Sequence, residues 1–580
     1  MTSSAPTSLE FDRIQPYQDR RFVPEDADLL DVVTVKGLYR QLIDRPVSGT
    51  PGFEQWIQDR SELEAALDQA GSIVYIRMTC QTDDQQRAEA YTHFIETISP
   101  AVQPLDDRLN NRFLELLDSY PLDEERYSVY IRDVRTQIEL FKPENVELQK
   151  QVSLLSQEYQ RICGAMTVEF DGREQTLPQM SKYQLELDRD LRERAWRAVS
   201  ERRAQDSDAL EDLFDKMLAI RHQIARNAGF PNFMEYKFKS LHRFDYTPDD
   251  CKQYHATVEK LVVPLWRQIS ERRRETMQLE RLRPWDGAVD PQGRPPLKPF
   301  SEVADLISGC ERVFARVDPE FGEQFAAMSR DGLLDLASRK GKAPGGYQSS
   351  LDEARRPFVF MNAVGVNGDV FTLLHEGGHS FHTLACRHDP LIDYRHGPME
   401  FNEVASMAME LMGAEHLDEF YSPEDKERAR TSHFEDVVYI LPWVALIDAF
   451  QHWIYENPGH SRAERRSKWV ELFRRFNGGG ADWSGLEAVE AVLWHRQLHI
   501  FEVPFYYIEY GIAQLGALQV WRNARQDGPR AVQAYKDGLA AGGALPVTDI
   551  YSRAGIKFCF TEDIIAPLMD AVREELNLGK

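Results

Sequence analysis

Three residues that can support metal chemistry, His375, Glu376 and His379, stand together in the segment DVFTLLHEGGHSF. The apolar residues around them and a capping Asp369 predict a helix over residues 369–381. Positions four apart lie on one face of a helix, so both imidazoles can reach a single metal ion. Glu376 then lies beside the coordination position left open for water, where a carboxylate can act as general base toward a metal-activated water. The segment predicts a hydrolytic zinc centre with His375 and His379 as ligands.

Two adjacent glycines, Gly377 and Gly378, lie inside this predicted helix. Each weakens a helix interior by about 1 kcal/mol relative to alanine. A helix that contains both is expected to need close approach of another group to its surface, either a ligand or a neighbouring helix. The five-residue motif alone does not decide between a metal site and a chance pattern, because helical histidines also fill space or form hydrogen bonds.

A second predicted helix, in the segment FNEVASMAMEL, supplies candidates for a third ligand. Glu403 and Glu410 are seven residues apart and share a face of this helix. A buried carboxylate needs a metal, a cation or hydrogen bonds. The spacing favours Glu403 as the ligand and Glu410 as a hydrogen-bonding support to a ligating histidine, with Glu400 as the alternative ligand. For His382, a hydrogen-bonding role is favoured over metal binding.

The remaining chain predicts a mainly α fold, because helical spacing of apolar residues recurs throughout. A short extended piece is predicted at Ser72 to Ile76. A β-hairpin is predicted at residues 167–177, around an Asp-Gly turn. A small sheet, formed by residues 340–350 and 357–362, is predicted to precede the metal-binding helix. A strand beside such a helix can offer its edge to an extended peptide, and a buried structural strand is the equally open alternative.

Length and composition predict one large body with two lobes. The 580 residues contain no low-complexity linker or repeat, and the boundary is placed after the hairpin. This gives an N-terminal helical lobe over residues 1–180 and a catalytic domain over residues 181–580. Hydrophobic residues make up 42% of the chain and charged residues 28%, which is typical of a globular protein with a sizeable core.

Charge and cysteine usage exclude several classes of partner and site. The net charge of -25 and the pI of about 5.1 argue against nucleic-acid binding, which needs a basic face. The N-terminal residues lack the apolar core of a signal peptide, and no run of about 18 apolar residues predicts a membrane span. We therefore expect a cytoplasmic protein. The six cysteines form no CxxC pair, so neither a disulfide framework nor a cysteine zinc site is predicted.

Three segments in order, HEGGHSFH, FNEVASMAMEL and HIFEVPFYYIEY, closely resemble the oligoendopeptidase F and thimet oligopeptidase family of zinc peptidases. RKGKAPGGY and IARNAGFPNFMEY are also similar to that family. The resemblance is dense over residues 340–510, thinner over 184–236 and only architectural before that. Together with the strand-edge argument, it predicts Gly345, Gly346 and Tyr347 as substrate-binding residues.

This resemblance implies a two-lobed helical zincin with one zinc ion per chain at the floor of a deep channel. Such a channel admits flexible oligopeptides and excludes folded proteins. The resemblance also implies Glu403 as the third ligand, with Glu410 behind it. His499, Tyr507 and Tyr510 match the family residues that hold the substrate carbonyl and the oxyanion, whereas Tyr506 leaves that alignment open by one residue.

The predicted function is zinc-dependent endopeptidase activity on short unstructured peptides. A metallocarboxypeptidase with the same motifs is one alternative, and it needs a fixed cation for the substrate's terminal carboxylate. A peptide-binding or scaffold protein with a structural metal is the other. The presence of Glu376 favours catalysis, because a structural site has no use for a carboxylate beside an open position. The sequence does not predict the oligomeric state.

Overall fold

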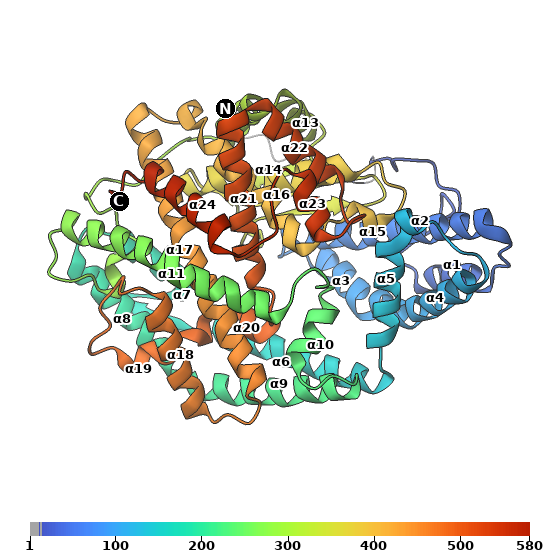
Figure 1. Cartoon of the computed structure of the whole chain (residues 1–580), viewed down its shortest axis with the longest axis horizontal. Coiled ribbons are helices and arrows are strands. Elements are labelled where there is room, and N and C mark those ends of the chain that lie inside the picture. The colour runs from blue at the N-terminus through green and yellow to red at the C-terminus, as the bar shows by residue number, and fades with distance from the viewer. Residues whose placement is uncertain (1–10, 12–13, 580) are drawn as a thin grey trace. The chain divides into compact units, whose positions relative to one another are not determined.

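Helices make up most of this chain, as a computed structural model of residue 11 and residues 14–579 shows (Figure 1). The described residues form two compact units, each built from several stretches of sequence. Unit 1 comprises residues 1–139, 297–429 and 513–558, and unit 2 comprises residues 140–296, 430–512 and 559–580. The long helices α17 (Pro423–Glu456) and α21 (Ile508–Asp527) each begin in one unit and end in the other.

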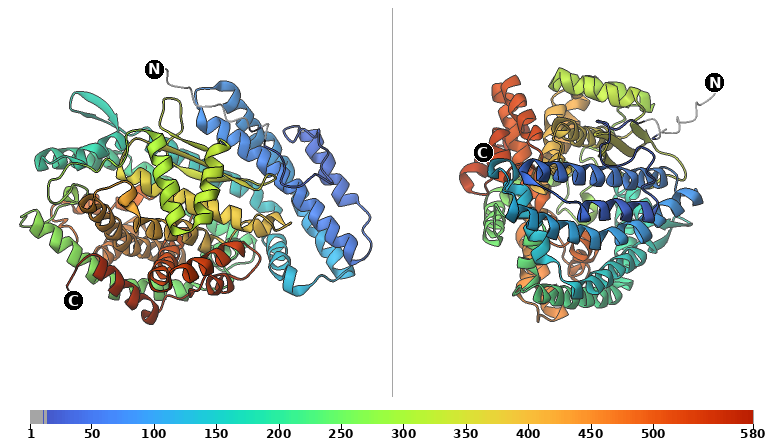
Figure 2. Two further views of the ribbon diagram at one scale, coloured as in Figure 1. Left: turned by 90° about the horizontal axis from the view of Figure 1, so that it is seen from above. Right: turned by 90° about the vertical axis from the view of Figure 1, so that its right-hand side faces the viewer.

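Unit 1 contains the N-terminal helices, a small sheet and the helices that follow this sheet. Its helices are α1 (Val32–Asp44), α2 (Gly49–Cys80), α3 (Gln85–His93), α4 (Ser99–Ser119), α5 (Glu124–Leu140), α12 (Val303–Val317), α13 (Pro319–Arg330), α14 (Asn367–Cys386), α15 (Ile392–Arg395), α16 (Met399–Ala414), α22 (Pro529–Ala540) and α23 (Val547–Arg553). The blue N-terminal helices lie side by side in Figures 1 and 2, and α1 packs on α4.

Unit 2 is helical apart from one hairpin. Its helices are α6 (Pro143–Gly164), α7 (Leu177–Met180), α8 (Arg189–Gln205), α9 (Ser207–Asn227), α10 (Phe233–Ser240), α11 (Pro248–Thr276), α18 (Arg462–Phe476), α19 (Glu487–Glu490), α20 (Leu498–Glu502) and α24 (Glu562–Glu575). The predicted hairpin is confirmed as β1 (Thr167–Phe170) and β2 (Arg173–Thr176). Asp171 and Gly172 both have positive φ at its turn, as an Asp-Gly hairpin turn requires.

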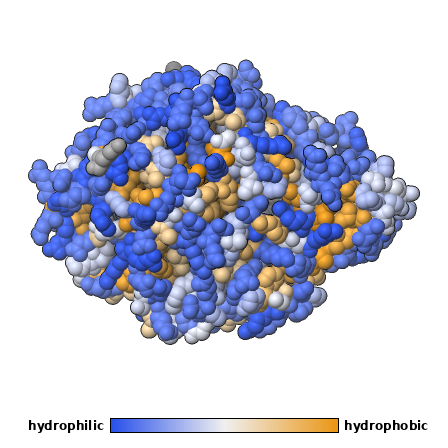
Figure 3. Space-filling model, viewed as in Figure 1, coloured by the Kyte–Doolittle hydropathy of each residue, from blue (hydrophilic) through white to orange (hydrophobic). Residues whose placement is uncertain are grey.

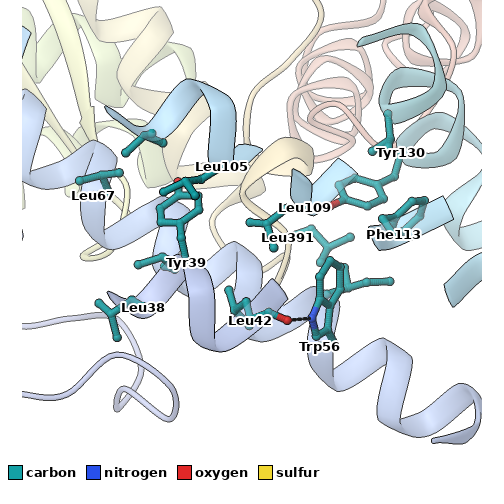
Figure 4. Packing of buried hydrophobic residues seen from close by; sticks show 14 of the residues in the cluster. Leu38, Tyr39, Leu42, Trp56, Leu67, Leu105, Leu109, Phe113, Tyr130 and Leu391 are labelled. Atoms are coloured by element: carbon teal, nitrogen blue, oxygen red, sulfur yellow. Dashed lines mark hydrogen bonds between the residues drawn. The ribbon is translucent and has the colours of Figure 1, made fainter. Parts of the chain in front are cut away.

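A large apolar cluster holds the N-terminal helices of unit 1 together (Figure 4). Leu42, Trp56, Leu109 and Phe113 are fully buried in it. The Trp56 indole N–H donates a hydrogen bond of 2.9 Å to the Leu42 carbonyl, which satisfies the one polar atom that this ring takes into the core. Leu391, which follows α14 in the chain, packs into the same cluster. The N-terminal helices and the segment after the predicted metal-binding helix therefore share one core.

The small sheet of unit 1 has three strands in the order β3-β5-β4. The predicted strands are confirmed as β4 (Tyr347–Leu351) and β5 (Arg356–Ala363), which pair antiparallel. The sequence analysis missed β3 (Leu334–Ala337), which pairs parallel with β5. Both β4 and β5 contact α14, so the sheet lies beside the predicted metal-binding helix. This confirms the predicted mainly α fold with a small sheet at that helix.

The prediction of an extended piece at Ser72 to Ile76 is wrong, because these residues lie within α2. Val74 and Ile76 are buried there. A β-branched run lowers helix propensity by only a fraction of a kcal/mol per residue, and burial of its side chains outweighs that cost.

One described helix, α17, is long and apolar enough to cross a membrane, judged by length and composition alone. In its most apolar stretch of 18 residues, 72% is buried inside the protein. Hydrophilic side chains cover most of the face shown in Figure 3.

Candidate active site

The helix α14 carries the two histidines and starts two residues earlier than predicted. Asp369 lies in its first turn, and one carboxylate oxygen accepts hydrogen bonds from the backbone N–H groups of Val364, Gly365 and Val366 at 2.8–3.0 Å. These bonds fix the loop that leads from β5 into the helix. An acidic side chain in the first turn also complements the partial positive charge of the helix N-terminus. Asp369 therefore determines where α14 begins.

A compact set of metal-binding atoms lies between α14 and α16. One ligand atom each from His375, His379 and Glu403 lies within 4.8 Å of the others. One Glu403 carboxylate oxygen is 3.3 Å from Nε2 of His375 and 3.5 Å from Nε2 of His379. Two imidazoles and one carboxylate are a donor set that suits zinc and leaves a coordination position open. The residues present fit a catalytic metal.

Glycine makes the close approach of α14 and α16 possible. A Cβ atom on Gly378 would collide with the carbonyl oxygen of Ala405 on α16, and one on Gly377 would collide with the ring of Phe314 on α12. The neighbouring-helix explanation for these glycines is therefore correct. Because Ala405 is two residues from Glu403, the same close contact brings the Glu403 carboxylate to the histidines. Figure 1 shows α14 and α16 next to each other.

Two further residues of α16 hold the ligand atoms in place. Ser406 lies one helical turn after Glu403, and Glu410 lies two turns after it. Nδ1 of His375 lies 2.7 Å from a Glu410 carboxylate oxygen, which leaves Nε2 directed to the metal-binding set. The Ser406 hydroxyl donates a bond of 2.9 Å to the Glu403 oxygen that faces both histidines. Such outer contacts fix the tautomer and orientation of the ligands. The sequence analysis identified Glu410 but missed Ser406. Ser406 could have been found from the sequence, because it lies on the same face of the predicted helix as Glu403 and Glu410.

The carboxylates and imidazoles of this set strongly perturb one another. Burial would raise the pKa of Glu403, but contacts with His375 and His379 lower this pKa well below its ordinary value. Burial would lower the pKa of His375, but contacts with Glu403 and Glu410 raise it well above its ordinary value. The site therefore attracts positive charge, which a divalent cation supplies.

Glu376 lies beside the ligand set with a buried side chain that is 7% exposed. Burial raises the pKa of its carboxyl group, and His375 and His379 limit this rise. The Gln348 backbone on β4 also limits this rise. A carboxyl group with a raised pKa suits a role that both takes and returns a proton near neutral pH.

Two other candidates lie outside the metal-binding set. Glu400, the alternative ligand, is buried at 2% exposure on α16 and does not belong to the set. His382 is buried against Gly397, and burial lowers the pKa of its imidazole to about 3. Its Nε2 has no hydrogen-bond partner among the described residues, so this atom lends no support to the hydrogen-bonding role favoured for His382, which stays a prediction. His382 is a neutral core residue that packs edge-on against Phe401.

The predicted substrate-binding segment lies at the start of β4. Gly345 has a φ of +97°, which only glycine adopts readily. A Cβ atom added to Gly346 would lie 3.4 Å from the Phe360 carbonyl oxygen, which is a tight contact. The Tyr347 ring stacks on Phe360, and its hydroxyl lies 2.6 Å from that of Thr79. The Tyr347 side chain therefore has structural partners in unit 1. Substrate binding by these three residues stays a prediction.

The late histidine and tyrosines form one aromatic cluster in unit 2. The His499 ring is 4.7 Å from the Tyr507 ring and 5.8 Å from the Tyr510 ring, and Tyr507 and Tyr510 are 5.2 Å apart. Tyr506 joins the same cluster at 5.7 Å from Tyr510. Burial raises the pKa of Tyr507 to about 12 and lowers that of His499, so both are neutral near pH 7. The side-chain amide of Gln497 lies 2.9 Å from Nδ1 of His499.

The backbone just before these tyrosines is held in an unusual conformation. Phe505 has a φ of +66°, which is rare for a residue with a side chain. Its N–H donates a 2.8 Å hydrogen bond to the Gln451 side chain, and its carbonyl accepts a 2.5 Å bond from Arg243. Strained backbone that surrounding groups hold in place is common at functional sites. The sequence analysis missed Arg243 and Gln451, because their role depends on contacts between distant segments.

Comparison with known proteins gives two family matches that together span most of the chain. Residues 183–569 match the family described as Peptidase family M3. Residues 26–141 match the one described as Peptidase M3 N-terminal domain. This chain belongs to peptidase family M3. The resemblance predicted from the three sequence segments is confirmed, and the chain is a metalloendopeptidase of this family.

Individual M3 relatives agree with this assignment. An oligoendopeptidase F homolog of Borreliella burgdorferi is 22% identical over 467 residues, which cover 75% of this chain and 76% of that protein. The oligopeptidase PepF of Bacillus subtilis is 26% identical over 42% of this chain and 37% of its own length. A solved structure of PZ peptidase A with an inhibitor is 28% identical, covers 96% of this chain and 99% of that one, and has a TM-score of 0.84. The M3 fold therefore extends over nearly the whole chain.

Proposed function

We propose that this M3 peptidase is a zinc-dependent oligopeptidase that uses Glu376 as its general base. The convergence of His375, His379 and Glu403 within 4.8 Å, with the buried Glu376 beside them, is the observation that carries the proposal. Zinc, when bound, supplies a Lewis acid that lowers the pKa of water to about 7 and polarises a carbonyl group. His375, His379 and Glu403 would hold it, with Glu410 as the support behind His375.

The chain's own residues then perform the proton transfers. Glu376 takes a proton from the attacking water and returns it to the leaving amine, which general acid–base catalysis requires of one carboxylate in both steps. Its buried position and raised pKa favour both roles. Tyr510 is proposed to donate a hydrogen bond to the oxyanion that forms as the water attacks, while His499 and Tyr507 hold the substrate carbonyl. We also propose that Gly345, Gly346 and Tyr347 bind the peptide substrate. We propose the cytoplasm as the location of the protein.

Digestion of a mixed library of short peptides tests the activity and its mode. We expect internal cleavage of unstructured peptides that a chelator abolishes and zinc restores, with natively folded proteins of similar sequence left intact. Mass spectrometry of the products separates the alternatives, because a carboxypeptidase releases single C-terminal residues. Cleavage that survives the chelator, or efficient cleavage of folded proteins, would contradict the proposal.

Tyr510→Phe is expected to lower kcat by about 100-fold to 1000-fold with little change in KM, because an oxyanion donor makes its full bond only in the transition state. Tyr507→Phe and His499→Ala should change both constants, since these residues are proposed to contact the bound peptide as well. Tyr506→Phe is the matched control in the same aromatic cluster. An unchanged kcat with a lowered melting temperature for Tyr510→Phe would make this tyrosine a packing residue, and a large effect of Tyr506→Phe would shift the assignment by one position.

A further inference from the structure

A second cluster of metal-binding side chains lies inside unit 2. The helix α11 contributes Cys251 and His255, and α17 contributes Asp448 and His452. Each pair is spaced by four residues, so each helix presents its two side chains on one face. One ligand atom each from Cys251, Asp448 and His452 lies within 4.8 Å of the others. His255 completes the cluster, with Nε2 at 2.8 Å from an Asp448 carboxylate oxygen.

We propose that these four residues form a closed, structural site for a divalent transition metal, with zinc as the expected ion. The site is separate from the catalytic metal set, which contains no thiol and whose residues all belong to unit 1. The proposal goes beyond the peptidase function and does not depend on it. It adds one metal to the single zinc ion that the sequence predicts for each chain.

All four side chains are withdrawn from solvent. Cys251 and Asp448 are 0% exposed, His452 is 3% exposed and His255 is 7% exposed. The rings of Phe238 and Phe505 pack edge-on against His452 at 6.1 Å and 5.5 Å. A catalytic site has to admit substrate, whereas a structural zinc site is enclosed by its four protein ligands. The burial therefore points to a structural role.

Several polar atoms of the cluster have no protein partner among the described residues. Neither Nδ1 nor Nε2 of His452 forms a hydrogen bond there, and the same holds for Oδ1 of Asp448. Nε2 of His452 lies 3.2 Å from Oδ2 of Asp448, but this contact does not have hydrogen-bond geometry. Buried polar atoms are almost always paired, because burial without a partner is costly. A metal ion would pair a His452 nitrogen and the Asp448 oxygen at once.

The charges in the cluster also fit a divalent cation. Asp448 brings one buried negative charge, and Cys251 brings a second when its thiol is deprotonated as a ligand. Two neutral imidazoles add none, so a divalent ion makes the buried group neutral. The nearby Arg243 is committed to Glu509, at 2.6 Å, and to the Phe505 carbonyl. A protonated His452 could also balance Asp448, whose Oδ2 lies 3.2 Å from Nε2, but the N–H at Nδ1 would still have no hydrogen-bond partner among the described residues.

The donor types select the ion. Thiolate and imidazole ligands suit zinc and related transition metals, whereas magnesium and calcium require oxygen ligands. Ligand bonds of about 2.0–2.3 Å put neighbouring donor atoms roughly 3.5 Å apart in a tetrahedral zinc site. The ligand atoms of Cys251, Asp448 and His452 lie within 4.8 Å of one another, and Nε2 of His255 lies 2.8 Å from an Asp448 oxygen, so side-chain rotations would have to bring the four donors to that spacing.

Metal analysis of the full chain, titrated with excess zinc and then desalted, tests the proposal. We expect about two zinc ions per parent chain and about one in Glu403→Ala, which lacks the third catalytic ligand. Cys251→Ser in the Glu403→Ala background should lose the remaining ion. The matched control is Cys310→Ser in the same background, because Cys310 is an equally buried cysteine outside both clusters and should leave the metal content unchanged.

Cobalt substitution gives a readout that identifies the thiolate and does not require activity. Thiolate-to-cobalt charge transfer absorbs in the near ultraviolet, and of the two clusters only this one contains a cysteine. The band should be present in Glu403→Ala, absent after Cys251→Ser, and unchanged by Cys310→Ser. A parent chain that binds one metal, with Glu403→Ala binding none and showing no cobalt–thiolate band, would overturn the proposal. Loss of catalysis without loss of this band would instead count against the peptidase site alone.

Discussion

Glu376→Gln should retain its metal and lose turnover by a factor of roughly 10²–10⁴, the range that general acid–base catalysis contributes. The amide has nearly the same shape as the carboxylate but can neither accept the water proton nor return it. The Glu376 side chain is buried beside the ligand set, and an amide of nearly the same shape fills the same space. Steady-state kinetics on an unstructured peptide, together with metal analysis of the same sample, measure both quantities.

The matched control for this substitution is Glu323→Gln. Glu323 is an exposed carboxylate on α13, also in unit 1, and its change should leave kcat within error of the parent. Turnover of Glu376→Gln within about tenfold of the parent would show that another group acts as the base. Loss of metal together with turnover would instead place Glu376 among the groups that hold the metal. Melting curves show whether the variant is folded, so that an unfolded sample is not scored as an inactive enzyme.

Glu403→Ala should lose metal affinity by more than about 100-fold, since even outer supports of a metal site cost about 10-fold to 100-fold when removed. Glu403 faces both histidines at 3.3 Å and 3.5 Å, whereas Glu410 contacts His375 from behind, at Nδ1. The expected order of loss is therefore Glu403→Ala first, Glu410→Ala second and Glu400→Ala last. A zinc titration monitored by a competing chelator measures this order.

Glu400→Ala is the matched control in this series, because Glu400 is the same residue type one helical turn before Glu403 on α16 and is the more deeply buried of the two. A larger loss of affinity in Glu400→Ala than in Glu403→Ala would move the third ligand by one turn. All three variants are made in a Cys251→Ser background, which keeps the second proposed metal out of every titration.

Features that depend on neighbouring residues were predictable from the sequence, whereas features that depend on distant contacts were not. The hairpin around Asp171 and Gly172 was predictable because its turn depends only on neighbouring backbone angles. The helix that carries His375 and His379 was predictable for the same kind of reason, since spacing by four residues alone puts both side chains on one face. The mainly α fold follows from the repetition of such local patterns along the chain.

Contacts between distant segments explain the features that the sequence analysis missed. Val74 and Ile76 favour a strand locally, yet burial within α2 makes them helical. The strand β3 forms only because β5, further along the chain, is available to pair with it. The neighbours that require glycine at positions 377 and 378 lie on α12 and α16.

The two metal clusters show the same division. The sequence by itself predicted the residues of the proposed catalytic set, because its motifs lie within about two helical turns on each helix and each helix shows which side chains share a face. It left open how closely α14 and α16 approach, and the tertiary structure decided this through Gly378. For Cys251, His255, Asp448 and His452 the sequence predicted no site, because the two pairs lie almost two hundred residues apart. Side chains so far apart in sequence become neighbours only when α11 and α17 are placed together by packing, and no spacing along the chain encodes that placement.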